Sequence, residues 1–382
     1  MIPYGMQDIS EEDIAAVVAV LKSPFLTQGP VVPEFENALA TYVGAKHGVA
    51  VNSATSGLHI ACLALGLGAG DVLWTSPVTF VASANCALYC SARVDFVDID
   101  PLTFNISVDA LQIKLEQAKA QGTLPKVLVC VHLCGQPCDM RAIHQLSLIY
   151  GFKIIEDASH AVGARYLNQP VGNCQFSDIT VFSFHPVKII TSAEGGMALT
   201  NDPHLARSMA LLRSHGITRD QAAMTQISEG PWYYQQVELG FNYRMTELQA
   251  ALGLSQMNRL DAYVAKRHSL VKRYDEQLSS LALSIPWQHQ DGYSSFHLYV
   301  VRLAEGLRRQ VFEAMRTRGI GVNVHYIPVH TQPYYQAMGF AVGDFPQAER
   351  YYAEAISLPL YPSLSETDQD RVIFSLREAL QS

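Results

Sequence analysis

Apolar, β-branched segments alternate with segments of helical periodicity through the first two-thirds of this 382-residue chain. The apolar segments are 49–52, 71–75, 94–97, 127–133, 153–156, 179–184 and 197–200. Helical segments follow the first two of them, at 56–65 and from about 79 to 89. Such alternation is typical of a mostly parallel sheet that is covered by helices on both faces. The sequence therefore predicts an α/β fold with a seven-stranded, mostly parallel sheet.

The last third of the chain has a different pattern. Residues 245–281 show the periodicity of one long helix, and residues 296–303 and 322–326 have the pattern of strands. With 49% hydrophobic residues, the chain has enough apolar material for two cores. We predict a large α/β domain over residues 1–250 and a smaller C-terminal α+β domain over residues 251–382.

A polar segment breaks the regular alternation. Residues 221–236 contain Gly230-Pro231 and two adjacent tyrosines. Gly-Pro pairs are typical of turns and loops. We expect this segment to be either an ordered excursion or a flexible loop.

Charge, hydropathy and cysteine content argue against several classes of protein. The net charge is −8 and the basic residues form no stripe, which argues against a nucleic-acid partner. No window approaches the roughly 18–20 apolar residues of a membrane span, and the amino terminus lacks a signal-like core. Seven cysteines at no paired spacing suit a reducing compartment. We therefore expect a cytoplasmic protein with neither a membrane nor a nucleic-acid partner.

A local group of Cys and His residues raises the question of a metal site. Cys130, His132, Cys134 and Cys138 lie close together in the sequence. A structural zinc site normally shows paired spacings such as C-x2-C, which this segment lacks. Residues 127–133 have instead the pattern of a buried strand, in which cysteine acts as a small hydrophobic residue. We therefore expect no metal.

Lys188 has the most informative setting of the charged residues. It lies just after an apolar strand and shortly before Gly195-Gly196. A lysine in a partly dry pocket loses its proton, and it can then form a Schiff base with a bound aldehyde. Taken alone, a lysine in such a position is usually a solvated loop residue. The motifs elsewhere in the chain favour the reactive lysine.

The segment Asn52-Ser-Ala-Thr-Ser-Gly57 joins a predicted strand to a predicted helix. Its backbone N–H groups and hydroxyls can converge on a phosphate at the positive end of the helix. Ser183, five residues before Lys188, can add another hydroxyl. A plain helix N-cap is the alternative, because Ser and Thr are common at that position.

Asp157 is the candidate partner for a ring nitrogen. The segment Glu156-Asp-Ala-Ser-His160 follows a strand and places Asp157 near the carboxyl edge of the sheet, where open α/β sheets bind ligands. A carboxylate there can hold a pyridine nitrogen protonated. The alternative is that Asp157 only caps the next helix.

A lysine, a carboxylate and an anion cradle match the aldehyde, ring nitrogen and phosphate of one cofactor, pyridoxal 5'-phosphate. Phe80 and His160 are candidates to lie against the two faces of its ring, although either could serve packing alone. We therefore predict a pyridoxal-phosphate enzyme.

Over nearly its whole length, the chain resembles the DegT-type nucleotide-sugar aminotransferases, which have pyridoxal-phosphate fold type I. The resemblance rests on residues 26–29, 52–57, 156–160, 182–196, 213–216, 239–247 and 324–330. It implies that Lys188 forms the Schiff base, that Asp157 contacts the pyridinium nitrogen, and that His160 lies against the ring. Dehydrating members of the family carry histidine in place of this lysine, so Lys188 favours transamination.

The resemblance also implies a phosphate site and a dimer. Ala54, Thr55, Ser56 and Ser183 would surround the phosphate. Asn242 would reach the phosphate of the other subunit, which implies a homodimer with its active sites at the interface.

Within the family, residues 191–196, 324–330 and 352–359 are most similar to the aminotransferases of pseudaminic acid biosynthesis. The implied reaction moves the amino group of L-glutamate to C4 of a UDP-linked 4-keto-6-deoxy-N-acetylhexosamine. It would follow a ping-pong Schiff-base mechanism with pyridoxamine 5'-phosphate as the intermediate form of the cofactor. The alternatives are another UDP- or dTDP-linked 3- or 4-keto sugar, or a non-catalytic sensor built on the same fold.

Six further residues are candidates to face the nucleotide sugar. They are Arg213, His215, Arg244, His325, Tyr326 and His330. The histidines could instead be satisfied structural groups. The planar guanidinium of Arg244 could bind a carboxylate or a diphosphate, or it could brace the dimer.

Overall fold

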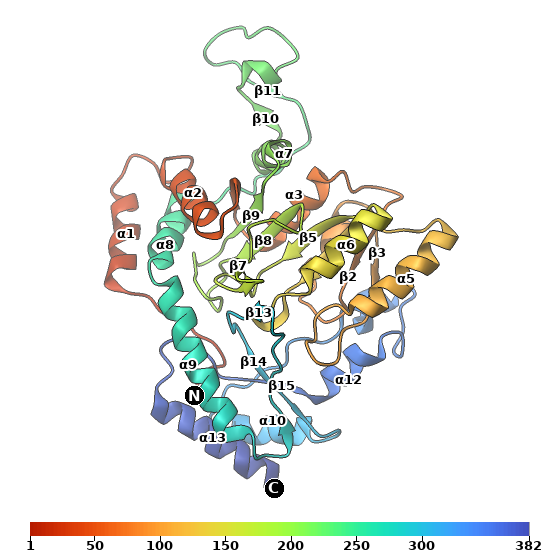
Figure 1. The fold of residues 1–382 in the computed structure, drawn as a ribbon. Helices are drawn as coiled ribbons and strands as arrows, with labels where there is room; N and C mark the ends of the chain where they lie inside the picture. The colour runs from red at the N-terminus through yellow and green to blue at the C-terminus, as the bar shows by residue number, and fades with distance from the viewer. Residues whose placement is uncertain (382) are drawn as a thin grey trace.

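A seven-stranded sheet forms the centre of the larger part of the molecule (Figure 1). The computed structural model describes residues 1–381. In spatial order the strands are β1 (His47–Val51), β9 (Gly196–Thr200), β8 (Ile179–Ser183), β5 (Lys153–Asp157), β4 (Val127–Val131), β2 (Val72–Thr75) and β3 (Arg93–Phe96). Only β9 runs against its neighbours in this described sheet. The predicted α/β class and mostly parallel sheet are confirmed.

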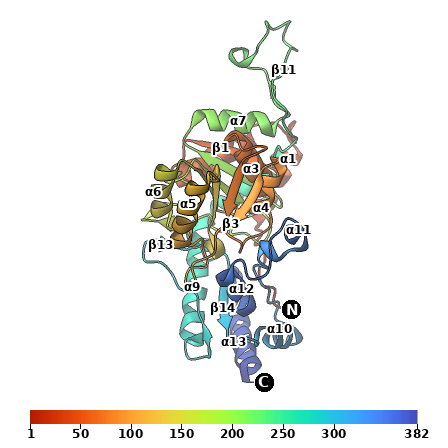
Figure 2. The ribbon, with the colours of Figure 1, turned by 90° about the vertical axis from the view of Figure 1, so that its right-hand side faces the viewer.

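Helices cover both faces of this sheet (Figure 2). One face carries α3 (Ala54–Ala64), α4 (Ala82–Tyr89) and α7 (Pro203–Arg213), and the other carries α2 (Val31–Val43), α5 (Val108–Gln121), α6 (Met140–Tyr150) and α8 (Glu247–Met257). Side chains of β4 alternate between the two faces: Val127 and Val129 pack with the α3–α4 side, and Leu128 packs with the α5–α6 side. Both faces of β4, β8 and β9 are buried, which explains why these strands appear in the sequence as continuous apolar runs.

Local signals fix where the helices begin and end. Ser107 caps α5, since its side chain accepts a hydrogen bond from the amide of Ala110. The helix ends at Gly122, whose φ of 68° is in the left-handed region that favours glycine.

A smaller sheet supports the second part of the molecule. It consists of β12 (Leu283–Ser284), β14 (Tyr299–Leu303) and β15 (Ala355–Leu358), with α10 (Arg308–Thr317), α12 (Pro346–Glu354) and α13 (Glu366–Gln381) beside it. Short elements complete the fold: β6 (Arg165–Tyr166), β7 (Gln169–Pro170), β13 (Gly292–Tyr293), η1 (Leu133–Gly135), η3 (Val329–Thr331) and α11 (Pro333–Gln336). The strand predicted at 322–326 is absent from the described chain, where Asn323 makes one isolated bridge to Ser357.

The long helix predicted at 245–281 is two helices, because Arg259 leaves helical geometry between α8 and α9 (Leu260–Leu278). The first turns of α9 pack into the core beneath the large sheet, and its later turns pack into the core of the small one. At the amino end of the chain, α1 (Glu11–Leu21) packs on α8. Since α9 contributes to both cores, a domain boundary near residue 250 stays a prediction.

Residues 217–240 project from the body as an arm (Figures 1 and 2). The arm contains β10 (Ile217–Thr218), η2 (Gln221–Ala223) and β11 (Gln235–Gln236), and β10 pairs with β11. Ile227 and Trp232 on this arm are 93% and 71% exposed. The polar segment predicted at 221–236 makes up most of this arm, and the choice between an ordered excursion and a flexible loop stays a prediction.

The Cys/His segment at 130–138 packs in the interior of the protein. Cys130 and Cys138 are buried in the core beside α5 and α6, and His132 lies 2.7 Å from the carboxylate of Glu156. Residues 1–381 contain no cluster of His, Cys, Asp or Glu arranged to hold a metal ion. Over the same residues, no helix has the length and apolar character needed to span a bilayer.

Candidate active site

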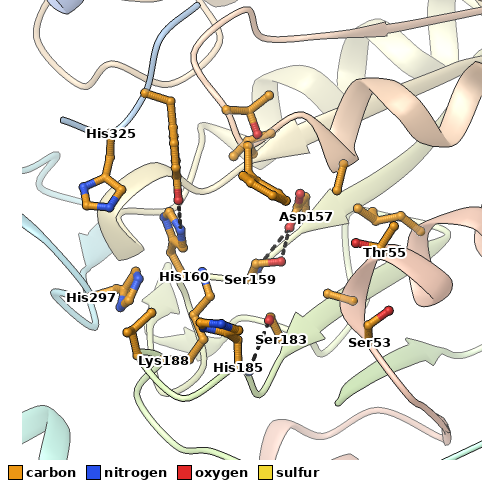
Figure 3. Close-up of a pocket in the computed structure, with 18 of the residues that line it drawn as sticks. Ser53, Thr55, Asp157, Ser159, His160, Ser183, His185, Lys188, His297 and His325 are labelled. Carbon is orange, nitrogen blue, oxygen red and sulfur yellow. Dashed lines mark hydrogen bonds between the residues drawn. The ribbon is translucent and has the colours of Figure 1, made fainter. Parts of the chain in front are cut away.

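A cavity of about 570 Å³ lies where the two parts of the molecule meet (Figure 3). Its walls come from the carboxyl ends of β5 and β8, the amino end of α3 and the segment before α4. Residues 323–326, His297 and Tyr4 close it from the side of the small sheet. The carboxyl edge of a parallel sheet is where open α/β folds bind ligands.

Lys188 lies in the loop that joins β8 to β9. Two backbone hydrogen bonds close the base of this loop, from Phe184 to Gly195 (2.9 Å) and from Ser192 to Phe184 (3.0 Å). The side chain of Lys188 lines the cavity. Burial lowers the pKa of its amine to about 8, against the opposing effect of the Asp157 charge. Half of the amine is therefore unprotonated near pH 8, where an ordinary lysine stays charged.

Asp157 ends β5 and lines the same cavity with 6% of its surface exposed. Its Oδ2 accepts a 2.6 Å hydrogen bond from the hydroxyl of Ser83. Its Oδ1 accepts from the hydroxyl (2.5 Å) and the amide (3.1 Å) of Ser159. The Ser83 hydroxyl also lies 2.7 Å from that of Thr79. Donors on both oxygens stabilise the charged carboxylate and fix its orientation.

The amino end of α3 provides an anion cradle. Ser53 caps the helix, since its hydroxyl accepts from the amide of Ser56 (3.1 Å). Within residues 1–381 the amides of Ala54 and Thr55 have no protein acceptor, and both residues line the cavity. These amides and the helix dipole favour an anion. A Cβ at Gly196 would lie 2.6 Å from the amide nitrogen of Ala54, so the strand beside the cradle requires glycine there.

Two other predicted phosphate contacts differ in position. Ser183 lines the cavity at the end of β8. Ser56 does not line the cavity, because its hydroxyl turns away to donate to Oδ1 of Asn52 (2.6 Å). A phosphate contact of Ser56 stays a prediction, whereas Ser53 is a cavity residue that the sequence prediction omitted.

The two predicted ring neighbours both line the cavity. Phe80 is 59% exposed and its ring lies 6.2 Å from that of Tyr326. His160 is buried, its Nδ1 accepts from the amide of Cys134 (3.2 Å), and its Nε2 lies 3.0 Å from the hydroxyl of Tyr326. Burial and the charge of Lys188 hold the pKa of His160 well below its ordinary value. His160 is therefore neutral, with its proton on Nε2.

The wall contributed by the small sheet is rich in uncharged polar groups. Burial, with the charge of Lys188, lowers the pKa of His325 to about 3. His325 Nδ1 lies 2.8 Å from the hydroxyl of Ser357, and the Tyr4 ring packs 5.1 Å from the His325 ring. The His297 ring lies 4.4 Å from that of His160 in a tilted arrangement, and its buried Nδ1 has no partner in the described chain. This wall can offer hydrogen bonds to a polar ligand without adding charge.

Four predicted substrate residues and Asn242 do not line this cavity. Arg213 donates to Glu36 (2.5 Å) and to the carbonyl of Ala50 (2.7 Å). His330 is fully buried, with Nε2 2.9 Å from Glu349. These partners support the structural alternative for His330, and they place Arg213 in an ion pair away from the cavity.

The other three residues lie in segments near the arm. His215 and Asn242 are exposed, and Arg244 has a buried Nε without a partner in the described residues. Asn242 bridges to Ser214, beside His215. Their roles stay predictions, because none of the three lines this cavity.

The sequence did not predict several residues that line the cavity, nor Ser83, which holds a cavity residue in place through a hydrogen bond. These are Tyr4, Ser53, Thr79, Ser83, Ser159, His185, Glu194, His297 and Asn323. Ser159, His185 and Glu194 lie inside motifs that were recognised, so their proximity to Asp157 or Lys188 was a usable signal. Ser83 and His297 reach the site only through tertiary packing.

The reactive groups that line the cavity fit pyridoxal 5'-phosphate. A lysine with a lowered pKa can meet an aldehyde, a buried carboxylate can meet a ring nitrogen, and the end of α3 can meet a phosphate. Figure 3 shows Lys188 and His160 on one side of the cavity, with Asp157 and Thr55 opposite.

Comparisons with known proteins give one consistent result. The sequence model of the DegT/DnrJ/EryC1/StrS aminotransferase family matches residues 7–377. Spore coat polysaccharide biosynthesis protein SpsC of Bacillus subtilis (strain 168) is 40% identical over 388 residues, covering 100% of this chain and 97% of the relative. The structure of Helicobacter pylori PseC, an aminotransferase of pseudaminic acid biosynthesis, superposes with a TM-score of 0.91 at 30% identity, covering 100% and 99% of the two chains. The PMP form of Spr1654, a sugar aminotransferase from Streptococcus pneumoniae, gives a TM-score of 0.90 at 30% identity with the same coverage.

Proposed function

The chain belongs to the DegT/DnrJ/EryC1/StrS aminotransferase family, and from this premise we propose its donor, acceptor and active residues. The protein transfers the amino group of L-glutamate to C4 of a UDP-linked 4-keto-6-deoxy-N-acetylhexosamine. The likeness to PseC over the whole chain supports this acceptor.

One observation carries the proposal: Lys188 and Asp157 line one cavity, and burial lowers the pKa of the lysine to about 8. A reactive amine and a fixed carboxylate are the two side chains that amino transfer on a pyridine aldehyde requires. A non-catalytic sensor would need neither the lowered pKa nor the buried carboxylate.

Pyridoxal 5'-phosphate is the cofactor, and when bound it supplies an electron sink for the carbon that carries the amino group. Lys188 holds the cofactor through Nζ, Asp157 binds its ring nitrogen, and the amides of Ala54 and Thr55 bind its phosphate. Ser183 adds a hydroxyl to that phosphate, and Ser53 fixes the helix end.

Lys188 is also the proton carrier. Its free Nζ would take the proton from the substrate carbon that carries the amino group and would hold it for return later in the cycle. An amine whose pKa is about 8 can both accept and donate this proton near neutral pH. The donor leaves as 2-oxoglutarate before the keto sugar enters, so the cycle is ping-pong.

The small-sheet wall binds the sugar. Tyr4, Asn323, His325 and Tyr326 face the cavity with neutral hydrogen-bonding groups, which suit hydroxyl and amide substituents. Phe80 would cover one face of the cofactor ring and His160 the other.

The active unit is a homodimer in the cytoplasm. Asn242 is exposed and does not line the cavity of its own chain, which supports a contact with the phosphate of the partner. His215 and Arg244, near Asn242, would reach the nucleotide of the partner in the same way. The proposed domains are residues 1–250 and 251–382.

A second acceptor has its own support. SpsC, a spore coat polysaccharide biosynthesis protein, is 40% identical to this chain, against 30% for PseC. The higher identity to SpsC supports an alternative acceptor, another nucleotide-linked 3- or 4-keto sugar.

Product analysis tests the proposal. The holoenzyme, L-glutamate and a panel of UDP- and dTDP-linked 3- and 4-keto sugars are incubated separately, and products are identified by mass spectrometry. A 4-amino product from the UDP-linked N-acetyl sugar alone supports the proposed acceptor. A product only from another sugar selects the alternative, and no product from any sugar contradicts both.

A further inference from the structure

The side chain of His297 is buried at the cavity and makes no hydrogen bond. His297 lies two residues before β14, retains 4% exposure and lines the cavity. Within residues 1–381 its ring nitrogens have no hydrogen-bond partner, and Nδ1 is buried as well. Buried polar groups in proteins normally have a partner, so an unpaired imidazole at a cavity indicates a place for a polar ligand.

The other two buried histidines of the cavity are already engaged. Nδ1 of His160 accepts from the amide of Cys134, and its Nε2 lies 3.0 Å from the hydroxyl of Tyr326. The ring of His325 has Ser357 at Nδ1 (2.8 Å) and Asn323 at Nε2 (3.3 Å). The imidazole of His297 is therefore the one with free hydrogen-bonding capacity among these three.

The free capacity of His297 is that of a donor. Burial holds the pKa of His297 well below its ordinary value, so the imidazole is neutral and carries one proton. Nδ1 is the buried ring nitrogen, so Nε2 is the nitrogen that the ring presents to the cavity. The proton belongs on Nε2, because a buried N–H without an acceptor is tolerated less well than a buried acceptor without a donor.

The backbone that carries His297 is fixed by a buried arginine. Arg267 on α9 is fully buried. Its Nη1 donates to the carbonyls of Phe296 (3.1 Å), His297 (3.2 Å) and Leu360 (2.9 Å). Phe296 has a φ of 49°, in the left-handed region that a phenylalanine rarely adopts. The protein thus holds an unfavourable backbone conformation directly before the residue that faces the cavity.

Arg267 also places a positive charge behind His297. In the described chain its partners are the three carbonyls, none is a carboxylate, and its Nε is unpaired. Burial lowers the pKa of Arg267 to about 9, which leaves the guanidinium charged at neutral pH. The amine of Lys188 lies on the same side of the cavity as His297 (Figure 3). This side of the cavity therefore favours an acceptor that carries negative charge.

We propose that His297 donates a hydrogen bond from Nε2 to a carboxylate of the amino donor, L-glutamate. The phosphate of the cofactor is assigned to the opposite side, where Thr55 lies. A nucleotide-linked keto sugar carries its negative charge on the diphosphate and has uncharged groups around the keto carbon. The anionic groups that come close to Lys188 are thus the carboxylates of the donor. This inference rests on the proposed function, because it assigns one contact of the proposed donor.

Binding of glutarate tests this contact without turnover. Glutarate has the two carboxylates of L-glutamate and no amine, so it can occupy the site of the donor without reacting. Isothermal titration calorimetry of the holoenzyme gives its dissociation constant for the wild-type, His297→Asn and His297→Gln proteins. The glutamine amide reaches the position of Nε2, whereas the asparagine amide reaches only that of Nδ1. The two variants are thus matched in polarity and differ in where they place the donor.

The expected result is a difference between these two variants. His297→Asn should raise the dissociation constant of glutarate roughly tenfold or more, because it removes a hydrogen bond to a charged group. His297→Gln should restore most of the affinity. Equal weakening in both variants would show that the imidazole only packs, and it would overturn the proposal. Unchanged affinity in a folded His297→Asn protein, or no binding of glutarate to the wild type, would overturn it as well.

Steady-state kinetics show which substrate uses His297. In a ping-pong cycle kcat/KM for each substrate reports only its own half of the cycle. His297→Asn should lower kcat/KM for L-glutamate and leave kcat/KM for the keto sugar nearly unchanged. An equal or larger fall for the sugar would overturn the assignment to the donor. A wild-type protein that forms no 2-oxoglutarate contradicts the proposed function instead, and the glutarate titration still decides whether His297 binds a carboxylate.

Discussion

The hydroxyl of Ser83 donates a 2.6 Å hydrogen bond to Oδ2 of Asp157, and the two residues are 74 positions apart in the chain. Ser83 lies on α4 and Asp157 at the end of β5. The orientation of the carboxylate therefore depends on a helix that packs on the sheet as well as on its own strand.

Replacing Ser83 by alanine should weaken cofactor binding. A hydrogen bond to a charged group contributes about 1.5–3 kcal/mol, so the dissociation constant of pyridoxal 5'-phosphate should rise roughly tenfold or more. Absorbance titration of the apoprotein measures it. Ser365→Ala, which removes an exposed hydroxyl bonded to Asp368, is the matched control. An unchanged constant in a folded Ser83→Ala protein would show that Ser159 alone orients Asp157.

The reactivity of Lys188 should depend on pH. Its pKa is lowered from 10.5 to about 8 by burial, so the folded protein loses this proton at lower pH than the unfolded chain does. The rate at which the apoprotein takes up pyridoxal 5'-phosphate should therefore rise through a midpoint near pH 8. Between pH 8 and 10.5 the unfolded chain binds more protons, so this group makes the free energy of unfolding increase with pH. A midpoint near 10 in stopped-flow absorbance would contradict the burial effect.

The hydroxyl of Tyr326 should stabilise the fold through His160. Because Nδ1 of His160 accepts from Cys134, its Nε2 carries the proton and donates to Tyr326. Tyr326→Phe leaves this donor unpaired, which should lower the free energy of unfolding by about 1–3 kcal/mol. Urea unfolding of the apoprotein measures the change. Tyr334→Phe, at a side chain that is 65% exposed, should show none, and equal stability of both variants would contradict a stabilising hydrogen bond between His160 and Tyr326.

A mixed dimer tests whether Asn242 acts across the interface. Lys188→Ala and Asn242→Ala homodimers should both be nearly inactive. If Asn242 serves the partner, unfolding and refolding an equal mixture should restore about 25% of wild-type activity, because half of the dimers contain one intact site. If Asn242 serves its own chain, no mixed dimer contains an intact site and the mixture stays inactive.

The sheet and the main motifs can be predicted from sequence because their signals are local. The central strands are buried on both faces, so they appear as apolar runs, and Asp157 comes at the end of one such run. Lys188 and residues 52–57 likewise sit between recognisable strands and helices. The family model and the structural neighbours confirm the family, the fold class and the transaminase class.

Features that depend on tertiary packing cannot be predicted from local sequence signals. Residues 322–326 are apolar enough for a strand but pair at only one position. The break between α8 and α9 at Arg259 leaves the apolar periodicity almost unchanged. Arg213 has the charge expected of a diphosphate ligand, yet the sequence does not reveal that Glu36, 177 residues away, is its partner.

The reaction of the holoenzyme with L-glutamate alone tests the central claim, that Lys188 and Asp157 carry out amino transfer in this cavity. The visible band of the cofactor should disappear on addition of L-glutamate, and one 2-oxoglutarate should form per active site in the absence of any sugar. Lys188→Ala, loaded with the same cofactor, should form none at a measurable rate. An unchanged spectrum in the wild-type protein, or equal 2-oxoglutarate from Lys188→Ala, would contradict the account.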